Sequence, residues 1–324
     1  MTIRALLARE GGVAFEELTD SDLPPHGVTV DVAYSSLNYK DGLAVTGRGR
    51  IVRRFPMVLG IDLAGTVVAS DVPEFQPGDR VLATGQGLGE MDWGGYTQRQ
   101  RVKPDALVPV PQGLSLEQAM HIGTAGITAM LCVLALERNE VLPSEREIVV
   151  TGAAGGVGSL AVMLLARRGY RVAAATGRPE LEGYLRELGA SSIIPRAELA
   201  AKGTPMQSER WGGGIDTVGG QTLANVYAQT AYEGAIACCG MAGGHELTIA
   251  VWPFILRNVS LLGVSSLRTS KPRRMEGWSR LATDLDAPKL AQLSRTEPLS
   301  DIVRLAGEIL DGQVRGRVAL DVNT

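Results

Sequence analysis

The chain of 324 residues is poor in the side chains that build disulfide frameworks and metal sites. Its three cysteines are too few for a disulfide framework or for a zinc site of four thiolates. Its three histidines, His26, His121 and His245, are scattered and do not have the spacing of metal ligands. We therefore expect no metal, and we expect the thiols to be reduced.

The sequence also lacks a strong charge bias, a leader and a long apolar run. The net charge of −3 is small, and no basic stripe with interleaved aromatic residues is present, which argues against a nucleic-acid partner. No apolar stretch typical of a signal peptide precedes Arg9 and Glu10. The most apolar helical pattern, residues 120–136, is too short and too rich in small residues to favour a membrane span. These absences predict a soluble, cytoplasmic protein.

Glycine, in contrast, is abundant and organises residues 148–159. The segment begins as a β-branched apolar run, has glycines at 152, 155 and 158, and continues as an apolar helical pattern. Such a strand, turn and helix brings backbone N–H groups close to a pyrophosphate. An ordinary tight turn also uses glycine, but a second strand predicted at residues 170–175 favours a dinucleotide site.

The end of that second strand indicates which dinucleotide binds. A site for NAD usually has an acidic residue there, whereas this chain has Ala175-Thr176-Gly177-Arg178. The guanidinium of Arg178 and the hydroxyl of Thr176 suit a 2′-phosphate, and Arg196 follows the next short strand. The alternative is that both arginines are solvated surface residues. The pattern favours NADPH.

The pattern of predicted secondary structure changes along the chain. Up to about residue 115, short strands (28–33, 58–68, 80–83 and 106–109) alternate with glycine and proline turns, which suggests a partly closed barrel. Ser115 and Gln118 resemble a capping box before a helix, and residues 123–136 predict another helix.

From residue 148 onward, strands alternate with helices, which predicts an α/β fold with a doubly wound parallel sheet. The predicted strands are 148–151, 170–175, 192–195, one ending at Asp216, 234–240 and 260–265. The predicted helices are 158–168, 180–188, 223–232, one containing Trp278, and 299–310. A last strand, 317–322, is expected to return to the N-terminal domain.

Several motifs in order resemble the medium-chain dehydrogenase/reductase superfamily. They are Asn38-Tyr39-Lys40-Asp41, residues 60–65, Pro77-Gly78-Asp79-Arg80-Val81, Gly94-Gly95-Tyr96 and the loop 153–158. The resemblance implies a β-rich GroES-like catalytic domain (1–122 and 267–324) and a Rossmann domain that binds NADP (123–266). Zinc alcohol dehydrogenases of this superfamily have Cys at the position of Asn38 and Gly-His-Glu at Gly60-Ile61-Asp62. The resemblance is therefore to the zinc-free, quinone-oxidoreductase-like branch.

Further segments resemble the acrylyl-CoA reductase (NADPH) group in particular: residues 38–43, 46–52, 55–56, 176–178 and 254–257. This resemblance implies reduction of acrylyl-CoA to propanoyl-CoA by a cytoplasmic, dimeric enzyme. It also implies the cofactor contacts, which fall on Tyr39, Ala154, Gly155, Gly156, Val157, Thr176, Gly177, Arg178, Arg196, Met241, Ile255 and Ser265. An exposed edge at the strand 260–265 is compatible with a homodimer.

The reaction needs hydride at the β-carbon and a proton at the α-carbon, by way of an enolate. One hypothesis is that the hydroxyl of Tyr39 donates to that enolate; the alternative is that Tyr39 only packs against the cofactor. Asn38 is expected to orient groups, and Asp41 and Asp62 are expected to be structural.

The phosphates of CoA need cations, and two basic clusters are candidates. One is the loop with Arg48, Arg50, Arg53 and Arg54, and the other contains Lys271, Arg273 and Arg274. Either cluster could equally be a solvated charge run. Two functional alternatives stay open: an NADPH-dependent quinone or enone reductase for small uncharged substrates, and an NADPH-binding protein without catalysis.

Overall fold

The computed structural model describes residues 2–25 and 27–324, so that His26 lies outside the described residues. The chain forms two compact units. Unit 1 comprises residues 1–127, 266–282 and 291–324, and unit 2 comprises residues 128–265 and 283–290. This division differs from the expected domain bounds in two respects. Residues 123–127 and 266 belong to unit 1, and residues 283–290 belong to unit 2.

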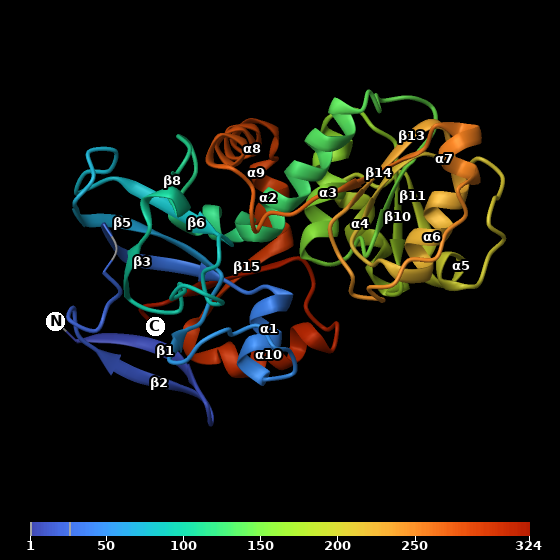
Figure 1. Cartoon of the computed structure of the whole chain (residues 1–324). Coiled ribbons are helices and arrows are strands. Elements are labelled where there is room, and N and C mark those ends of the chain that lie inside the picture. Colours follow the sequence, from blue (N-terminus) through green and yellow to red (C-terminus); the bar gives the residue numbers. More distant parts are fainter. Residues whose placement is uncertain (1, 26) are drawn as a thin grey trace. The chain divides into compact units, whose positions relative to one another are not determined.

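Unit 1 is built on two β-sheets (Figure 1). The smaller has the strand order β2 (Gly12–Leu18), β1 (Ile3–Arg9), β4 (Met57–Val58). The larger follows the order β15 (Ser294–Pro298), β16 (Arg317–Asp321), β3 (Val28–Ser36), β5 (Asp62–Ser70), β6 (Arg80–Thr84), β8 (Val108–Pro109), with β7 (Arg99–Val102) also paired to β3. Strand β16 pairs antiparallel with β3, which confirms the predicted return of the C-terminal strand.

The single strand predicted at 58–68 is wrong, because the chain passes from one sheet to the other within it. Met57–Val58 pairs with β1, whereas β5 begins at Asp62 in the larger sheet. Gly60 between them has a φ of 93°, which ends the extended run. The strand predicted at 106–109 is also shorter than expected, because Pro104–Ala106 forms a 3₁₀ turn.

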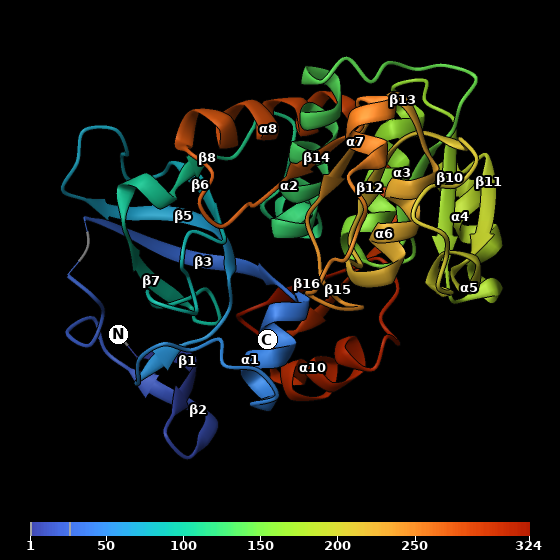
Figure 2. The same cartoon turned by 45° about the vertical axis from the view of Figure 1, so that its right-hand side comes forward.

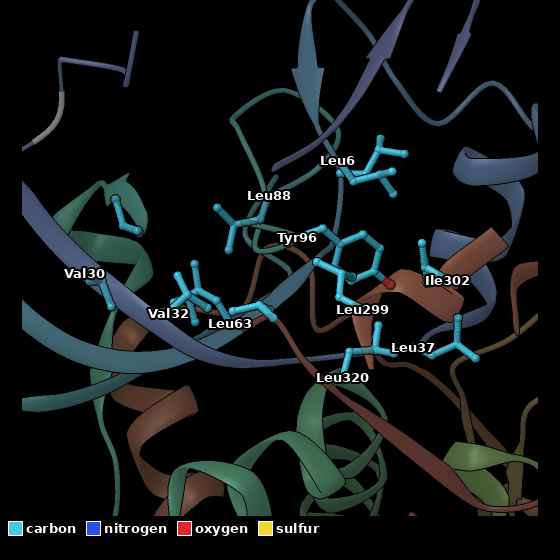
Figure 3. Packing of buried hydrophobic residues seen from close by; sticks show 14 of the residues in the cluster. Leu6, Val30, Val32, Leu37, Leu63, Leu88, Tyr96, Leu299, Ile302 and Leu320 are labelled. Carbon is cyan, nitrogen blue, oxygen red and sulfur yellow. The ribbon is translucent and has the colours of Figure 1, made fainter. Parts of the chain in front are cut away.

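Helices α1 (Tyr39–Thr46) and α10 (Ile302–Leu310) pack side by side in unit 1 (Figures 1 and 2). The apolar core beneath them surrounds the buried ring of Tyr96, near Leu6, Leu299 and Ile302 (Figure 3). The helix predicted at 299–310 is divided into a 3₁₀ turn, Leu299–Asp301, and α10. The helices α8 (Lys271–Asp284) and α9 (Ala287–Leu293) precede β15.

Helix α2 (Leu116–Arg138) joins the two predicted helical segments. The capping box is confirmed, since the Gln118 amide donates to Ser115 Oγ over 3.0 Å and the Ser115 amide donates to Gln118 Oε1 over 2.9 Å. Gly123 interrupts the helix with a φ of 52°. In the described chain α2 is the one helix long and apolar enough to cross a membrane, but 83% of its apolar window is buried within the protein, as in a core helix of a folded domain.

Unit 2 is a six-stranded parallel sheet flanked by helices (Figure 2). Its strand order is β11 (Ser192–Pro195), β10 (Val172–Thr176), β9 (Ile148–Thr151), β12 (Trp211–Asp216), β13 (Thr230–Cys238), β14 (Ser260–Gly263). This is the 3-2-1-4-5-6 order of a dinucleotide-binding sheet, so the predicted doubly wound fold is confirmed. The helices that lie wholly within it are α3 (Gly156–Arg167), α4 (Glu182–Leu188), α5 (Arg196–Ala200), α6 (Gly220–Gln229) and α7 (Trp252–Arg257).

All three predicted helices of unit 2 have different bounds, and α3 covers Gly156–Arg167 where 158–168 was predicted. The helix predicted at 223–232 ends at Gln229, because the hydroxyl of Thr230 donates to the carbonyl of Val226 and Thr230 begins β13. The helix predicted at 180–188 starts with a 3₁₀ turn, Pro179–Leu181, and continues as α4 from Glu182.

Candidate active site

The glycine-rich segment of unit 2 forms the turn between β9 and α3. Gly152 has a φ of 59°, and a side chain at Gly158 would collide with the carbonyl of Gly152. Ala154 is buried, while Gly155, Gly156 and Val157 are partly exposed at the start of α3. The turn therefore presents its backbone in the way that a pyrophosphate site requires.

Two arginines converge at the carboxyl ends of β10 and β11. The guanidinium of Arg178 donates to the carbonyl of Ala154 over 2.8 Å, and its amide donates to Thr176 Oγ1 over 3.1 Å. The guanidinium of Arg196 lies so close to Gly177 that a Cβ there would be 2.8 Å from Cζ. The structure thus places Thr176, Gly177, Arg178 and Arg196 together beside the glycine-rich turn, as a site for a 2′-phosphate needs.

The other predicted cofactor contacts of unit 2 are dispersed along later segments. Met241 follows β13, Ser265 follows β14, and Ile255 lies on α7; all three are exposed, Met241 and Ile255 each by 70%. Two of the three therefore follow carboxyl ends of sheet strands, the edge at which ligands bind in such sheets.

Sequence reasoning missed the role of Asp216, which connects the carboxyl ends of β12 and β9. Its buried carboxylate accepts from Thr151 Oγ1 over 2.7 Å and from the amide of Gly219 over 2.7 Å. The Thr217 amide and hydroxyl in turn donate to Thr151. Burial raises the pKa of Asp216 above its ordinary value. A polar residue ending an apolar strand was the available signal, but its partners are distant in sequence.

Unit 1 contains a polar cluster, which we define as Ser36, Asn38, Asp41, Asp62, Thr124 and Arg317. All of these residues are buried except Thr124, which is partly buried. The carboxylate of Asp62 accepts hydrogen bonds from Ser36 Oγ (2.5 Å), Asn38 Nδ2 (3.0 Å), the Thr124 amide (2.8 Å) and Thr124 Oγ1 (2.5 Å). Its two oxygen atoms therefore already have four donors.

Arg317 supplies the positive charge of this cluster from β16. Its guanidinium donates to the carbonyls of His121 and Leu37, to Asn38 Oδ1 over 3.3 Å and to Ser36 Oγ over 3.1 Å. Burial lowers the pKa of Arg317, and the nearby Asp62 and Asp41 act in the opposite direction. Burial of these charges costs desolvation energy, so removal of one member would leave the others uncompensated in the interior.

Asp41 joins the cluster to α1. Its carboxylate accepts from the amide of Asn38 over 2.9 Å, from Asn38 Nδ2 over 3.0 Å and from the Ile61 amide over 3.0 Å. Burial, followed by the charge of Asp62, raises the pKa of Asp41 to about 7. Both aspartates are bonded within the fold, which agrees with the structural role expected for them.

Asn38 and Tyr39 differ in what they offer to a substrate. Asn38 is buried, and its amide is occupied by Asp41, Asp62, Ser36 and Arg317. Tyr39 is the first residue of α1 and is 48% exposed. The cluster therefore fixes the start of α1 and leaves the Tyr39 side chain accessible.

The predicted basic residues are not equivalent. Arg48, Arg50 and Arg53 are exposed on the loop after α1, whereas Arg274 is buried and donates to the carbonyls of Asp105 and Ala106. Burial lowers the pKa of Arg274. Its guanidinium connects α8 to the turn before β8, and this placement argues against a role in binding CoA.

Two family models match the chain, one for each kind of domain. The alcohol dehydrogenase GroES-like domain matches residues 24–112, and the zinc-binding dehydrogenase model matches residues 156–283. The protein named "Probable acrylyl-CoA reductase AcuI" of Escherichia coli is 50% identical over 98% of this chain and 99% of its own. Acrylyl-CoA reductase AcuI of Ruegeria pomeroyi is 49% identical over 96% of this chain and 94% of its own.

This chain belongs to the medium-chain dehydrogenase/reductase superfamily. Within it, the chain falls in the group that contains the acrylyl-CoA reductases, as the sequence motifs predicted. Among solved structures, the yhdH oxidoreductase of Salmonella enterica in complex with NADP matches with a TM-score of 0.96 and 51% identity, over 99% of both chains. The predicted family and the predicted oxidoreductase class are both confirmed.

The name of one family model includes zinc, but the residues of the polar cluster do not fit that ion. Asn38 offers a neutral amide, the oxygen atoms of Asp62 have four donors, and the Arg317 guanidinium lies against the same side chains. Among residues 2–25 and 27–324, no group of three or more His, Cys, Asp or Glu side chains could hold a metal. Zinc prefers sulfur, imidazole and free carboxylate ligands.

Proposed function

We propose that this chain reduces the carbon–carbon double bond of acrylyl-CoA with NADPH and releases propanoyl-CoA and NADP⁺. The observation that carries the proposal is the end-to-end similarity, at half of all positions, to two proteins named as acrylyl-CoA reductases. The fold alone would not support a substrate, because this superfamily hosts many reactions.

The arginine pair of unit 2 supports NADPH as the cofactor. Arg178 and Arg196, with the hydroxyl of Thr176, would hold the 2′-phosphate, and the backbone from Ala154 to Val157 would hold the pyrophosphate. Tyr39, Met241, Ile255 and Ser265 stay predictions as further contacts. When bound, NADPH supplies the hydride that adds to the β-carbon of the substrate.

Addition of hydride leaves an enolate, whose oxygen atom needs a hydrogen-bond donor and whose α-carbon needs a proton. Tyr39 is about half exposed at the start of α1, and we assign this donor role to its hydroxyl. Asn38 has no free amide hydrogen to donate, so its role is to hold the start of α1 against the polar cluster. One proton from solvent is consumed for each hydride transferred.

The test is oxidation of NADPH, followed by its ultraviolet absorbance, with acrylyl-CoA, crotonyl-CoA and a simple quinone in parallel. We expect acrylyl-CoA to be reduced with NADPH and much more slowly with NADH. Turnover of the quinone with inert CoA thioesters would replace the proposal with the quinone or enone alternative.

A second experiment examines Tyr39. We expect Tyr39→Phe to lower kcat about 100-fold, because loss of one hydrogen-bond donor to a developing oxyanion costs about 10²–10³-fold in kcat. Tyr232→Phe is the matched control, since Tyr232 is also an exposed tyrosine but lies on β13 of unit 2. An unchanged kcat in Tyr39→Phe would leave Tyr39 with a packing role only.

A further inference from the structure

The loop between α1 and β4, residues 47–56, contains four arginines and no acidic residue. We call it the basic loop. It has no regular secondary structure, and all four of its arginines, Arg48, Arg50, Arg53 and Arg54, are exposed. A CoA thioester carries a pyrophosphate and a 3′-phosphate, and planar guanidinium groups recognise phosphate by paired hydrogen bonds.

Two of the four arginines are already bonded to carboxylates of unit 1. Arg48 Nη1 lies 3.2 Å from Asp311, and Arg54 Nη2 lies 3.4 Å from Asp92. In the part of the chain that the structure describes, the side chains of Arg50 and Arg53 have no hydrogen bond or ion pair. These two guanidinium groups can therefore bind a phosphate without first giving up a carboxylate.

The basic loop is also tied to the segment that contains Tyr39. The amide of Arg53 donates to the carbonyl of Glu90 over 3.0 Å, and the Glu90 carboxylate lies 2.6 Å from Lys40 Nζ. Lys40 directly follows Tyr39 on α1. These contacts fix the basic loop against the first turn of α1, which carries Tyr39. A CoA thioester with its acyl group at Tyr39 would reach the basic loop through its long pantetheine arm.

We propose that Arg50 and Arg53 bind the phosphates of the CoA thioester, since Arg48 and Arg54 each already have a carboxylate partner. This inference rests on the proposed function and adds the subsite that separates a CoA thioester from an uncharged enone. It narrows the basic cluster predicted from the sequence to two residues.

The experiment compares acrylyl-CoA with acrylyl-pantetheine, which has the same reacting group but no phosphates. In the double variant Arg50→Ala/Arg53→Ala, we expect KM for acrylyl-CoA to rise at least about tenfold, since a hydrogen bond to a charged group contributes that much or more. We expect kcat to change little and the kinetics with acrylyl-pantetheine to stay as in the wild type.

The matched control is Arg295→Ala/Arg304→Ala, which removes two charges from exposed, ion-paired arginines elsewhere in unit 1. An equal rise of KM in this control would show a general charge effect and overturn the inference. An unchanged KM for acrylyl-CoA in Arg50→Ala/Arg53→Ala, or an equal loss with both thioesters, would also overturn it.

Calorimetric titration with CoA separates this inference from the proposed function. If the wild type reduces neither thioester, the proposed function fails, but weaker CoA binding in Arg50→Ala/Arg53→Ala than in the control still supports the subsite. If CoA binds both double variants equally, or does not bind the wild type, the subsite is wrong.

Discussion

Asp41 is the residue whose protonation most directly couples the polar cluster to stability. Its pKa of about 7 lies above its ordinary value, so the folded chain holds the proton more tightly than the unfolded chain does. Asp41 therefore contributes stability at low pH, and this contribution falls as the pH rises from about 4 to about 7. The largest slope for one such group is about 1.4 kcal/mol per pH unit.

We expect the unfolding free energy of the wild type, relative to Asp41→Asn, to fall by about 2–3 kcal/mol between about pH 5 and about pH 8. Urea unfolding at several pH values measures this difference. Asp71→Asn, at an exposed carboxylate of the same unit, is the matched control. A difference that does not vary with pH would show that Asp41 is ionised throughout this range.

Arg178 is the residue that we expect to distinguish NADPH from NADH. We expect Arg178→Ala to raise KM for NADPH at least about tenfold and to leave KM for NADH unchanged, because only NADPH carries the 2′-phosphate. Arg186→Ala, an exposed arginine on α4 paired with Glu182, controls for the loss of charge. Equal changes for both cofactors would place Arg178 at the pyrophosphate or outside the site.

The residues of the candidate nucleotide site could be predicted from the sequence, because the glycine-rich turn and the strand after it are close together in the chain. The absent carboxylate after β10 and the arginines at 178 and 196 are all within one βαβ region. The partners of Asp62 could not be predicted. They are Ser36 of β3, Asn38 before α1 and Thr124 of α2, and only the tertiary fold brings these together.

Among the elements, the contact between α1 and α10 depends on a missing side chain. A Cβ at Gly42 of α1 would lie 2.8 Å from Ile309 Cγ2 and 3.1 Å from the carbonyl of Ala306. We expect Gly42→Ala to destabilise the protein by about 1–3 kcal/mol, although alanine is the better helix former, because overpacking outweighs helix propensity here.

Gly307 is the matched control on the partner helix α10, since a Cβ there meets no atom within 4 Å. We expect Gly307→Ala to stabilise the protein by about 0.5–1 kcal/mol, because alanine forms helices better than glycine. At Gly42 the steric clash outweighs the same gain. Calorimetric unfolding measures both. Partial rescue of Gly42→Ala by Ile309→Ala would confirm the contact, and additive effects would contradict it.

Most elements of unit 2 could be predicted because their strands are continuous apolar runs separated by helical periodicity. The end of α6 could not, since Ala231 and Tyr232 fit the helical pattern and only the Thr230 hydroxyl and pairing with Trp211 decide for a strand. In unit 1 the division at residues 59–61 was missed for a similar reason. Hydrophobicity is unchanged there while the strand changes its partner sheet.

For the whole molecule, the edge of the parallel sheet leads us to expect a homodimer. β14 is the last strand of that sheet, and exposed apolar side chains are found on the preceding α7, where Trp252 is 53% and Leu256 is 60% exposed. An unpaired edge beside apolar side chains favours association with a second copy.

Size-exclusion chromatography with light scattering should therefore give the mass of two chains for the wild type. The variant Trp252→Glu/Leu256→Glu should give the mass of one chain. Circular dichroism checks that the variant is folded. The control Met91→Glu/Phe55→Glu replaces two other exposed apolar residues, which lie in unit 1, and should stay dimeric. A wild type of one chain mass at micromolar concentration would rule out the expected dimer.

The sequence by itself determined the family, the two kinds of domain and the nucleotide-binding segment, because these depend on local patterns of glycine, charge and hydrophobic period. Only the tertiary structure decided which side chains are available. In the folded chain Arg274 is buried, and Arg48 and Arg54 are paired with carboxylates. The side-chain amide of Asn38 is hydrogen-bonded within the polar cluster. Burial and pairing depend on residues far apart in the chain, and no local pattern encodes them.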